Sequence, residues 1–222
     1  MSGHLAILKR VGVTLTIVGA LDLVIMIVSI VKHVSYSSSF NIFAVVAGIY
    51  LIKGSIRAAR VVHWIVASML VAFIGMTIVQ LVIRPIQLTI TWYKMNPYGH
   101  VASYSFTLLV IAFLLWIFTQ LSKPEVMAAR KEAGFRTGPP VYAYVLSTIA
   151  LLGFSVAMLV VNHGETANIV KKLATKELGE GYSYYIDSIS WSNAGNMATV
   201  IAYTENDIKG IRVSWGTKKD SN

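Results

Sequence analysis

Residues 61–83 read "VVHWIVASMLVAFIGMTIVQLVI", 23 consecutive positions without an Asp, Glu, Lys or Arg. A helix needs about 20 apolar residues to cross the hydrocarbon core of a bilayer, and soluble domains carry about 25% charged residues. This chain of 222 residues is 55% hydrophobic and 13% charged. The stretch therefore predicts a membrane-spanning helix, in a chain whose fold class is a mostly α-helical integral membrane protein.

Similar apolar runs lie on both sides of this stretch. Residues 11–31 contain one charged side chain, and residues 105–121 and 141–161 contain none. A fifth run, residues 40–52, is shorter and ends at Lys53. Together these runs predict a transmembrane domain of residues 1–163 with five spans, at about 11–31, 40–57, 61–83, 104–121 and 141–161. The chain has no cysteine, which excludes disulfides and thiolate metal sites.

The basic residues are divided unevenly between the two sides of this arrangement. One side holds nine before residue 164, namely Lys9, Arg10, Lys53, Arg57, Arg60, Lys123, Arg130, Lys131 and Arg136, and the other holds Lys32, Arg84 and Lys94. Positive loops stay in the cytoplasm. The N-terminus is therefore predicted to be cytoplasmic and residues 164–222 periplasmic, in a bacterial inner membrane or an organelle membrane of bacterial descent. The net charge of +9 is interpreted as loop charge and not as a nucleic-acid site.

Residues 164–222 have the pattern of a small α+β domain. Apolar residues at helical spacing predict a helix from Glu165 to Leu178, ended by glycines. Three runs rich in β-forming residues follow, at 182–191, 197–204 and 208–215, with turn residues at 193–196 and 205–207. We expect a helix followed by a three-stranded antiparallel meander. So small a domain needs support from the membrane part or from a partner.

Residues 86–92, in the predicted outside loop 84–104, alternate between apolar and polar side chains. This period predicts a strand that packs on the C-terminal domain. The alternative is an irregular loop at the membrane interface, where Trp92, Tyr93, Tyr98 and Tyr104 form an aromatic belt. On the opposite side, residues 124–134 predict a short basic helix, held either by anionic headgroups or by a cytoplasmic partner.

Asp22 is an acidic residue within the first span. It shares one helix face with Gly12, Thr16, Gly19, Met26 and Ser29, which collects most of the small and polar residues of that span. A charge near mid-membrane costs roughly 2.5–3.5 kcal/mol, so this face should contact protein and not lipid. Three roles stay open for Asp22: helix packing within the chain, a contact with another subunit, and a proton or ion pathway.

Few residues form a recognisable chemical constellation. His33, His100 and His163 fall on the outside face, where three imidazoles could bind a metal or haem, but no local spacing supports such a site. No phosphate-binding glycine loop, H-E-x-x-H or G-x-S-x-G motif is present. The sequence therefore predicts no enzyme activity, and it predicts no cofactor and no favoured metal site.

The leading hypothesis from the sequence is a non-catalytic accessory subunit or assembly factor of a larger bacterial inner-membrane complex. Its partners would be the lipid bilayer and other integral membrane subunits. The intramembrane contact would use Asp22, Gly19 and Thr16, and the periplasmic contact would use Tyr184, Ile186, Trp191, Ile211 and Trp215. The alternatives are a metal- or haem-handling protein that uses the three outside histidines, and a small channel or proton-coupled carrier centred on Asp22.

Overall fold

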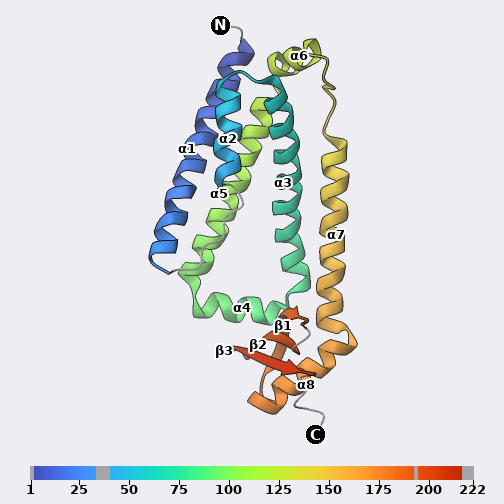
Figure 1. Ribbon diagram of the computed structural model, residues 1–222. Helices are drawn as coiled ribbons and strands as arrows, with labels where there is room; N and C mark the ends of the chain where they lie inside the picture. The colour runs from blue at the N-terminus through green and yellow to red at the C-terminus, as the bar shows by residue number, and fades with distance from the viewer. Residues whose placement is uncertain (1–2, 34–40, 193–194, 217–222) are drawn as a thin grey trace. The chain divides into compact units, whose positions relative to one another are not determined.

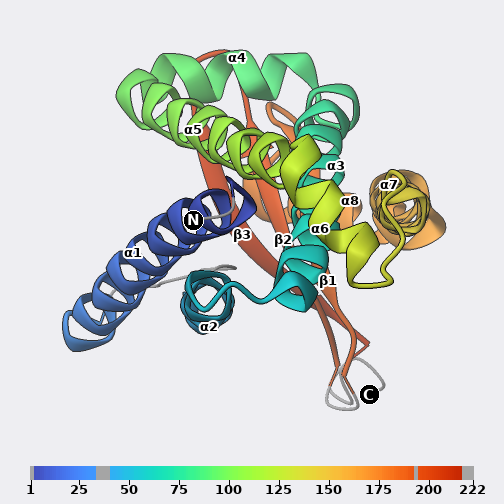
Figure 2. The ribbon, with the colours of Figure 1, turned by 90° about the horizontal axis from the view of Figure 1, so that it is seen from above.

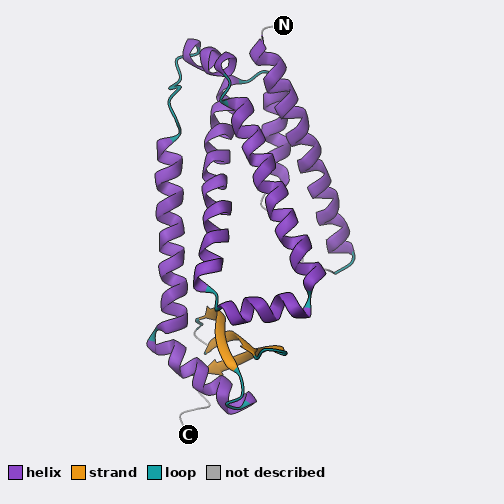
Figure 3. Cartoon of the chain, turned by 180° about the vertical axis from the view of Figure 1, so that it is seen from behind, coloured by secondary structure: helices purple, strands orange, loops and turns teal. Residues whose placement is uncertain are grey.

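The computed structural model describes residues 3–33, 41–192 and 195–216, which form helices and one C-terminal sheet (Figures 1 and 3). The elements are α1 (Gly3–Val31), α2 (Asn41–Ile52), α3 (Ile56–Ile83), α4 (Ile86–Met95), α5 (Pro97–Leu121), α6 (Pro124–Glu132), α7 (Val141–His163), α8 (Glu165–Leu178), β1 (Ser183–Ser190), β2 (Asn196–Tyr203) and β3 (Ile208–Trp215). The chain divides into two compact units, which we describe separately: unit 1 is residues 1–71 and 110–147, and unit 2 is residues 72–109 and 148–222.

Four helices are long and apolar enough to cross a membrane: α1, α3, α5 and α7. They contain 29, 28, 25 and 23 residues. At 1.5 Å per residue the shortest is about 35 Å long, more than the hydrocarbon core of about 30 Å. The four long apolar runs of the sequence are thus confirmed as helices of spanning length, and the chain is a multi-pass membrane protein.

The fifth predicted span is not confirmed as a span. Its helix, α2, has 12 residues, which is about 18 Å and too short to cross the hydrocarbon core alone. It ends at Ile52 because the chain turns there: Gly54 has a φ of +77°, and its N–H donates to the carbonyl of Leu51. A glycine with positive φ just after a helix is a common stop. Residues 34–40, which precede α2, lie outside the described residues.

In unit 1, α2 packs closely along α1 (Figure 1). A Cβ at Gly12 would lie 2.6 Å from the Gly48 carbonyl oxygen, and one at Gly19 would lie 2.8 Å from Val45 Cγ2. Small residues let helix backbones approach each other in this way. A Cβ at Gly54 would meet Leu5 at 2.7 Å, so the chain leaving α2 lies beside the first turns of α1.

In unit 2, β2 lies between β1 and β3, and both pairings are antiparallel (Figure 2). One face of this sheet packs under α8 in a core of seven buried residues: Ala167, Val170, Ala174, Ile186, Ala198, Val200 and Val213. A bulge between Ile186 and Ser188 adds one residue to β1. Because of this extra residue, Ile186 and Ile189 both contact the core under α8. The predicted helix and antiparallel meander are therefore present.

Residues 86–95 form a helix, α4, so both the predicted strand and its alternative, an irregular loop, were wrong for this segment. The alternating pattern misled because its buried members also fit a helix: Leu88 and Thr91 are buried and three positions apart. The predicted packing against the C-terminal domain is present. Leu88 clusters with Tyr185, Ile201 and Tyr203 on the sheet face opposite α8, and Thr91 Oγ1 donates to the carbonyl of Thr204 at 2.8 Å.

Candidate functional site

A basic cleft lies in unit 1, where α3 begins and where α6 turns toward α7. Its walls are formed by three arginines, Arg60, Arg130 and Arg136, with His63, Trp64, Gly134 and residues 137–142. The cleft has a volume of about 920 Å³. Its basic side chains come from two segments that are about 70 positions apart in the sequence, and they meet where the Arg130 side chain contacts His63.

A chain of hydrogen bonds fixes the back of the cleft. Arg130 Nη1 lies 3.1 Å from His63 Nδ1, and His63 Nε2 lies 3.0 Å from Ser122 Oγ. An arginine can only donate, so Nδ1 accepts, and Nε2 carries the imidazole proton and donates to Ser122. Ser122 in turn donates to the carbonyl of Phe118 at 2.7 Å. The imidazole also stacks on the Phe118 ring at 4.7 Å, so one tautomer and one ring orientation satisfy every contact.

Arg130 is buried, at 4% exposure, although it carries a charge. Its Nη2 donates to the carbonyl of Arg136 at 3.1 Å, and its Nη1 lies 3.4 Å from Met127 Sδ. Its Nε is buried without a hydrogen-bond partner. Burial and the positive charge of Arg60 both lower the pKa of Arg130. Within the described residues, no carboxylate forms an ion pair with any of the three cleft arginines.

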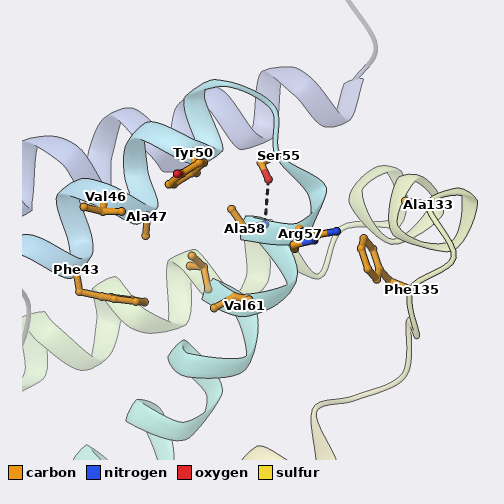
Figure 4. Close-up of a pocket in the computed structure, with 11 residues that line it drawn as sticks. Phe43, Val46, Ala47, Tyr50, Ser55, Arg57, Ala58, Val61, Ala133 and Phe135 are labelled. Atoms are coloured by element: carbon orange, nitrogen blue, oxygen red, sulfur yellow. Dashed lines mark hydrogen bonds between the residues drawn. The ribbon is translucent and has the colours of Figure 1, made fainter.

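Arg60 is held by an aromatic ring. Its guanidinium carbon lies 5.1 Å from the centre of the Phe135 ring, a cation–π contact. The same ring faces a second hollow, a mostly apolar groove of about 730 Å³ (Figure 4). Phe43, Val46, Ala47 and Tyr50 of α2 line this groove, as do Ser55, Arg57, Ala58, Val61 and Val62 at the start of α3, with Ala133 and Phe135 after α6. Phe135 therefore lines the apolar groove and also contacts Arg60, which lines the basic cleft.

The residues predicted to bind a periplasmic partner separate into two groups. Tyr184, Ile186, Ile211 and Trp215 all belong to the sheet face under α8. Ile186 is fully buried there, and the other three pack around the buried core, so this face supports the domain. Trp191, just after β1, is 64% exposed. Met197, the second residue of β2, is also exposed.

The two outer strands of the sheet differ in what covers their edges. Asn162, near the end of α7, is buried beside the outer edge of β1. Its Nδ2 donates to the Ile186 carbonyl at 3.1 Å, and its Oδ1 accepts from the Ile186 N–H at 3.0 Å. In the described part of the chain no backbone group pairs with the outer edge of β3. As far as the described residues go, the edge of β3 is therefore open for hydrogen bonding.

The predicted intramembrane residues lie on the face of α1 that packs against α2. Gly19 contacts Ala44 and Val45, and Thr16 lies against Gly48 while its Oγ1 donates to the carbonyl of Gly12. Asp22 is half-buried, three residues further along the same face. Gly19 and Thr16 thus contact α2 of the same chain. Their predicted contact with a second protein stays a prediction.

In the described residues no three His, Asp or Glu side chains gather closely enough to hold a metal ion, and this includes His33, His100 and His163, which were predicted to share the outside face. His100 lies between two aromatic rings, with ring centres 5.7 Å from Trp92 and 6.4 Å from Tyr104. His163 Nδ1 lies 3.2 Å from the carbonyl of Leu159. His100 and His163 therefore have separate surroundings, and the described residues give the metal hypothesis no geometric support.

Sequence reasoning missed Asn162 and the pairing of His63 with Arg130. Arg130 had a detectable signal: it stands four residues after Val126, on the same stripe of a short helix, and both are buried. The sequence signal for Asn162 was weaker, because a single polar residue near the end of an apolar helix is common. No protein-family model, curated protein or solved structure matches this chain.

Proposed function

We propose that this protein is a non-catalytic accessory subunit or assembly factor of a bacterial inner-membrane complex, and that its C-terminal domain binds a protein partner through the end of the sheet that carries Trp191. The observation that carries the proposal is the exposure of Trp191 on a domain whose two sheet faces are already covered, by α8 and by α4. Exposed tryptophans are strongly enriched among residues that dominate protein–protein binding energy.

The surroundings of Trp191 also suit a protein partner. Trp191 follows Ser190, which pairs with Met197, another exposed apolar residue. Asn196 pairs with Trp215, the last residue of β3, so the open edge of β3 ends at the same end of the sheet. An extended segment of a partner could therefore add to β3 and cover the apolar side chains at this end.

The proposed orientation places the N-terminus in the cytoplasm and the C-terminal domain in the periplasm. It is supported by the return of α2 along α1: the contact of Gly54 with Leu5 places the start of α3 beside the start of α1. In this proposal α2 belongs to a fifth crossing in its effect on topology, although its 12 residues are too few to span the hydrocarbon core alone. The nine basic residues then share one side, and positively charged loops favour the cytoplasm.

The test is recovery of the partner with the tagged full-length chain, after gentle extraction from its own membranes and native mass analysis. We expect a defined assembly with other proteins. Trp191→Ala should lower the yield of the partner at least about tenfold, the effect of losing an interface residue worth over 1.4 kcal/mol. Met197→Ser should lower it by a smaller factor.

The matched control is Ile169→Ser, which alters an exposed apolar residue of the same domain on α8. It should leave the yield of the partner unchanged. A lone monomer or homo-oligomer from native membranes would overturn the subunit proposal. An assembly that survives Trp191→Ala at wild-type yield would retain the subunit role but overturn the assignment of the contact to this end of the sheet.

A further inference from the structure

The cleft with three arginines in unit 1 has no role in the contact proposed for the C-terminal domain. We infer that the cleft is a binding site for the phosphate group of an anionic lipid, held by Arg60, Arg130 and Arg136. This site would exist whether or not the chain joins a larger complex, so its test is independent of the subunit proposal.

The charge balance of the cleft is the first argument. Three guanidinium groups line it, and none has a carboxylate partner in the described residues. Neither acid of the adjoining helix α6 lines the cleft. Glu125 lies beside the N-terminal turn of α1, where its Cγ would be 3.6 Å from a Cβ at Gly3, and Glu132 is exposed. A bound anion would supply the missing negative charge.

The fixed geometry of the arginines is the second argument. Arg130 is buried at 4% exposure, is anchored to His63 and to the Arg136 carbonyl, and has a buried Nε with no partner. Arg60 is held over the Phe135 ring. A preorganised pair of guanidiniums loses little side-chain entropy when it binds, and planar guanidinium groups match phosphate oxygens.

The position of the cleft along the helices is the third argument, and it favours a lipid as the source of the phosphate. The long uncharged run of α3 starts at Val61, and that of α7 starts at Val141. The cleft is lined by Arg60, by Trp64 and by Tyr142, so it lies at the level where both apolar helices begin. Aromatic side chains at this level are typical of the headgroup region. Basic pockets between membrane helices bind anionic headgroups.

The experiment measures lipid binding to the full chain in uncharged detergent by native mass spectrometry, with phosphatidylglycerol or phosphatidylcholine added separately. We expect phosphatidylglycerol to bind at least about fivefold more tightly, with one molecule per chain retained most strongly. Arg60→Gln and Arg136→Gln change exposed side chains, and each should lower this affinity about fivefold. Arg60→Lys should lower the affinity less than Arg60→Gln, because an ammonium retains the charge but lacks the planar fork of guanidinium.

Arg10→Gln is the matched control, because it removes one exposed positive charge from α1 outside the cleft. It should leave the affinity unchanged. Equal affinities for the two lipids, or an equal loss of phosphatidylglycerol affinity in Arg10→Gln and Arg136→Gln, would overturn the proposed site. Either result would show that the lipid is attracted by the overall positive charge and not bound in the cleft. Displacement of phosphatidylglycerol by an excess of inorganic phosphate would overturn the lipid as the source and assign the cleft to a soluble phosphate compound.

Discussion

Gly12 and Gly48 bring the backbones of α1 and α2 into contact. A Cβ at Gly12 would lie 2.6 Å from the Gly48 carbonyl oxygen, and a Cβ at Gly48 would lie 2.7 Å from the Gly12 carbonyl oxygen. Neither atom can move away without displacing a helix, because both belong to the backbone. This crossing decides which face of α1 is covered within the chain, and it returns the chain to the start of α1.

Replacing Gly48 with Val should therefore separate α1 from α2. Overpacking of a tight contact costs about 1–3 kcal/mol, and we expect a lower midpoint of thermal unfolding in detergent. The control is Gly153→Val in α7, where an added Cβ meets nothing within 4 Å. A Gly48→Val chain as stable as the Gly153→Val chain would contradict the close crossing.

Asn162 should stabilise the C-terminal domain by completing the edge of β1. Asn162→Leu leaves the buried N–H and carbonyl of Ile186 without partners, and each unsatisfied group costs about 1–3 kcal/mol. We expect faster hydrogen exchange at the Ile186 amide and earlier unfolding of the sheet. Asn168→Leu, on the exposed face of α8, should change neither. Unchanged exchange at Ile186 in the Asn162→Leu chain would show that water replaces the amide without cost.

The contact of Arg130 with His63 should hold the segment after α6 in place. Arg130→Lys cannot reach the His63 Nδ1 and the Arg136 carbonyl together, because an ammonium lacks the planar fork of guanidinium. We expect faster cleavage by chymotrypsin after Phe135 in this variant. Lys131→Gln changes an exposed neighbour and should be cleaved at the wild-type rate. Equal cleavage rates in the two variants would assign the segment's order to other contacts.

The turn between β2 and β3 should loosen in acid. Hydrogen bonds from Tyr182 and Lys209 lower the pKa of Asp207, and the Lys209 charge lowers it further. A carboxyl whose folded pKa lies below its unfolded value stabilises the fold above the unfolded pKa, about 3.9. That stabilisation is lost as the pH falls through the lower folded pKa.

Chemical-shift titration of Asp207 checks this expectation directly, as does the acid dependence of exchange at the Thr204 amide, which donates to the Asp207 carbonyl. Asp207→Asn should remove the acid dependence of hydrogen exchange at the Thr204 amide. Glu205→Gln changes an exposed neighbour and should retain that acid dependence. The effect is small because the pair is exposed to solvent. An Asp207 pKa at or above its ordinary value would contradict the geometry of the turn.

The elements that the sequence predicted correctly carry a strong local signal, either a long uncharged run or an apolar stripe on one helix face. Uncharged runs such as residues 61–83 coincide with helices of spanning length. The helix predicted at Glu165–Leu178 has the observed bounds, because an apolar stripe on one face is closed by Gly179. The prediction failed at residues 86–92, where alternation suited a strand but the buried side chains Leu88 and Thr91 also lie on one face of a helix.

Local composition and period were enough to predict which segments can lie in a bilayer and which form the sheet, because burial of apolar side chains depends on both. The contacts of those segments became known from the tertiary structure. It placed α2 against the small-residue face of α1, put Ile186 beneath α8 and aligned Asn162 with the edge of β1. It also brought Arg130 to His63, 67 positions apart. Such contacts depend on how distant segments fold together, which local period does not specify.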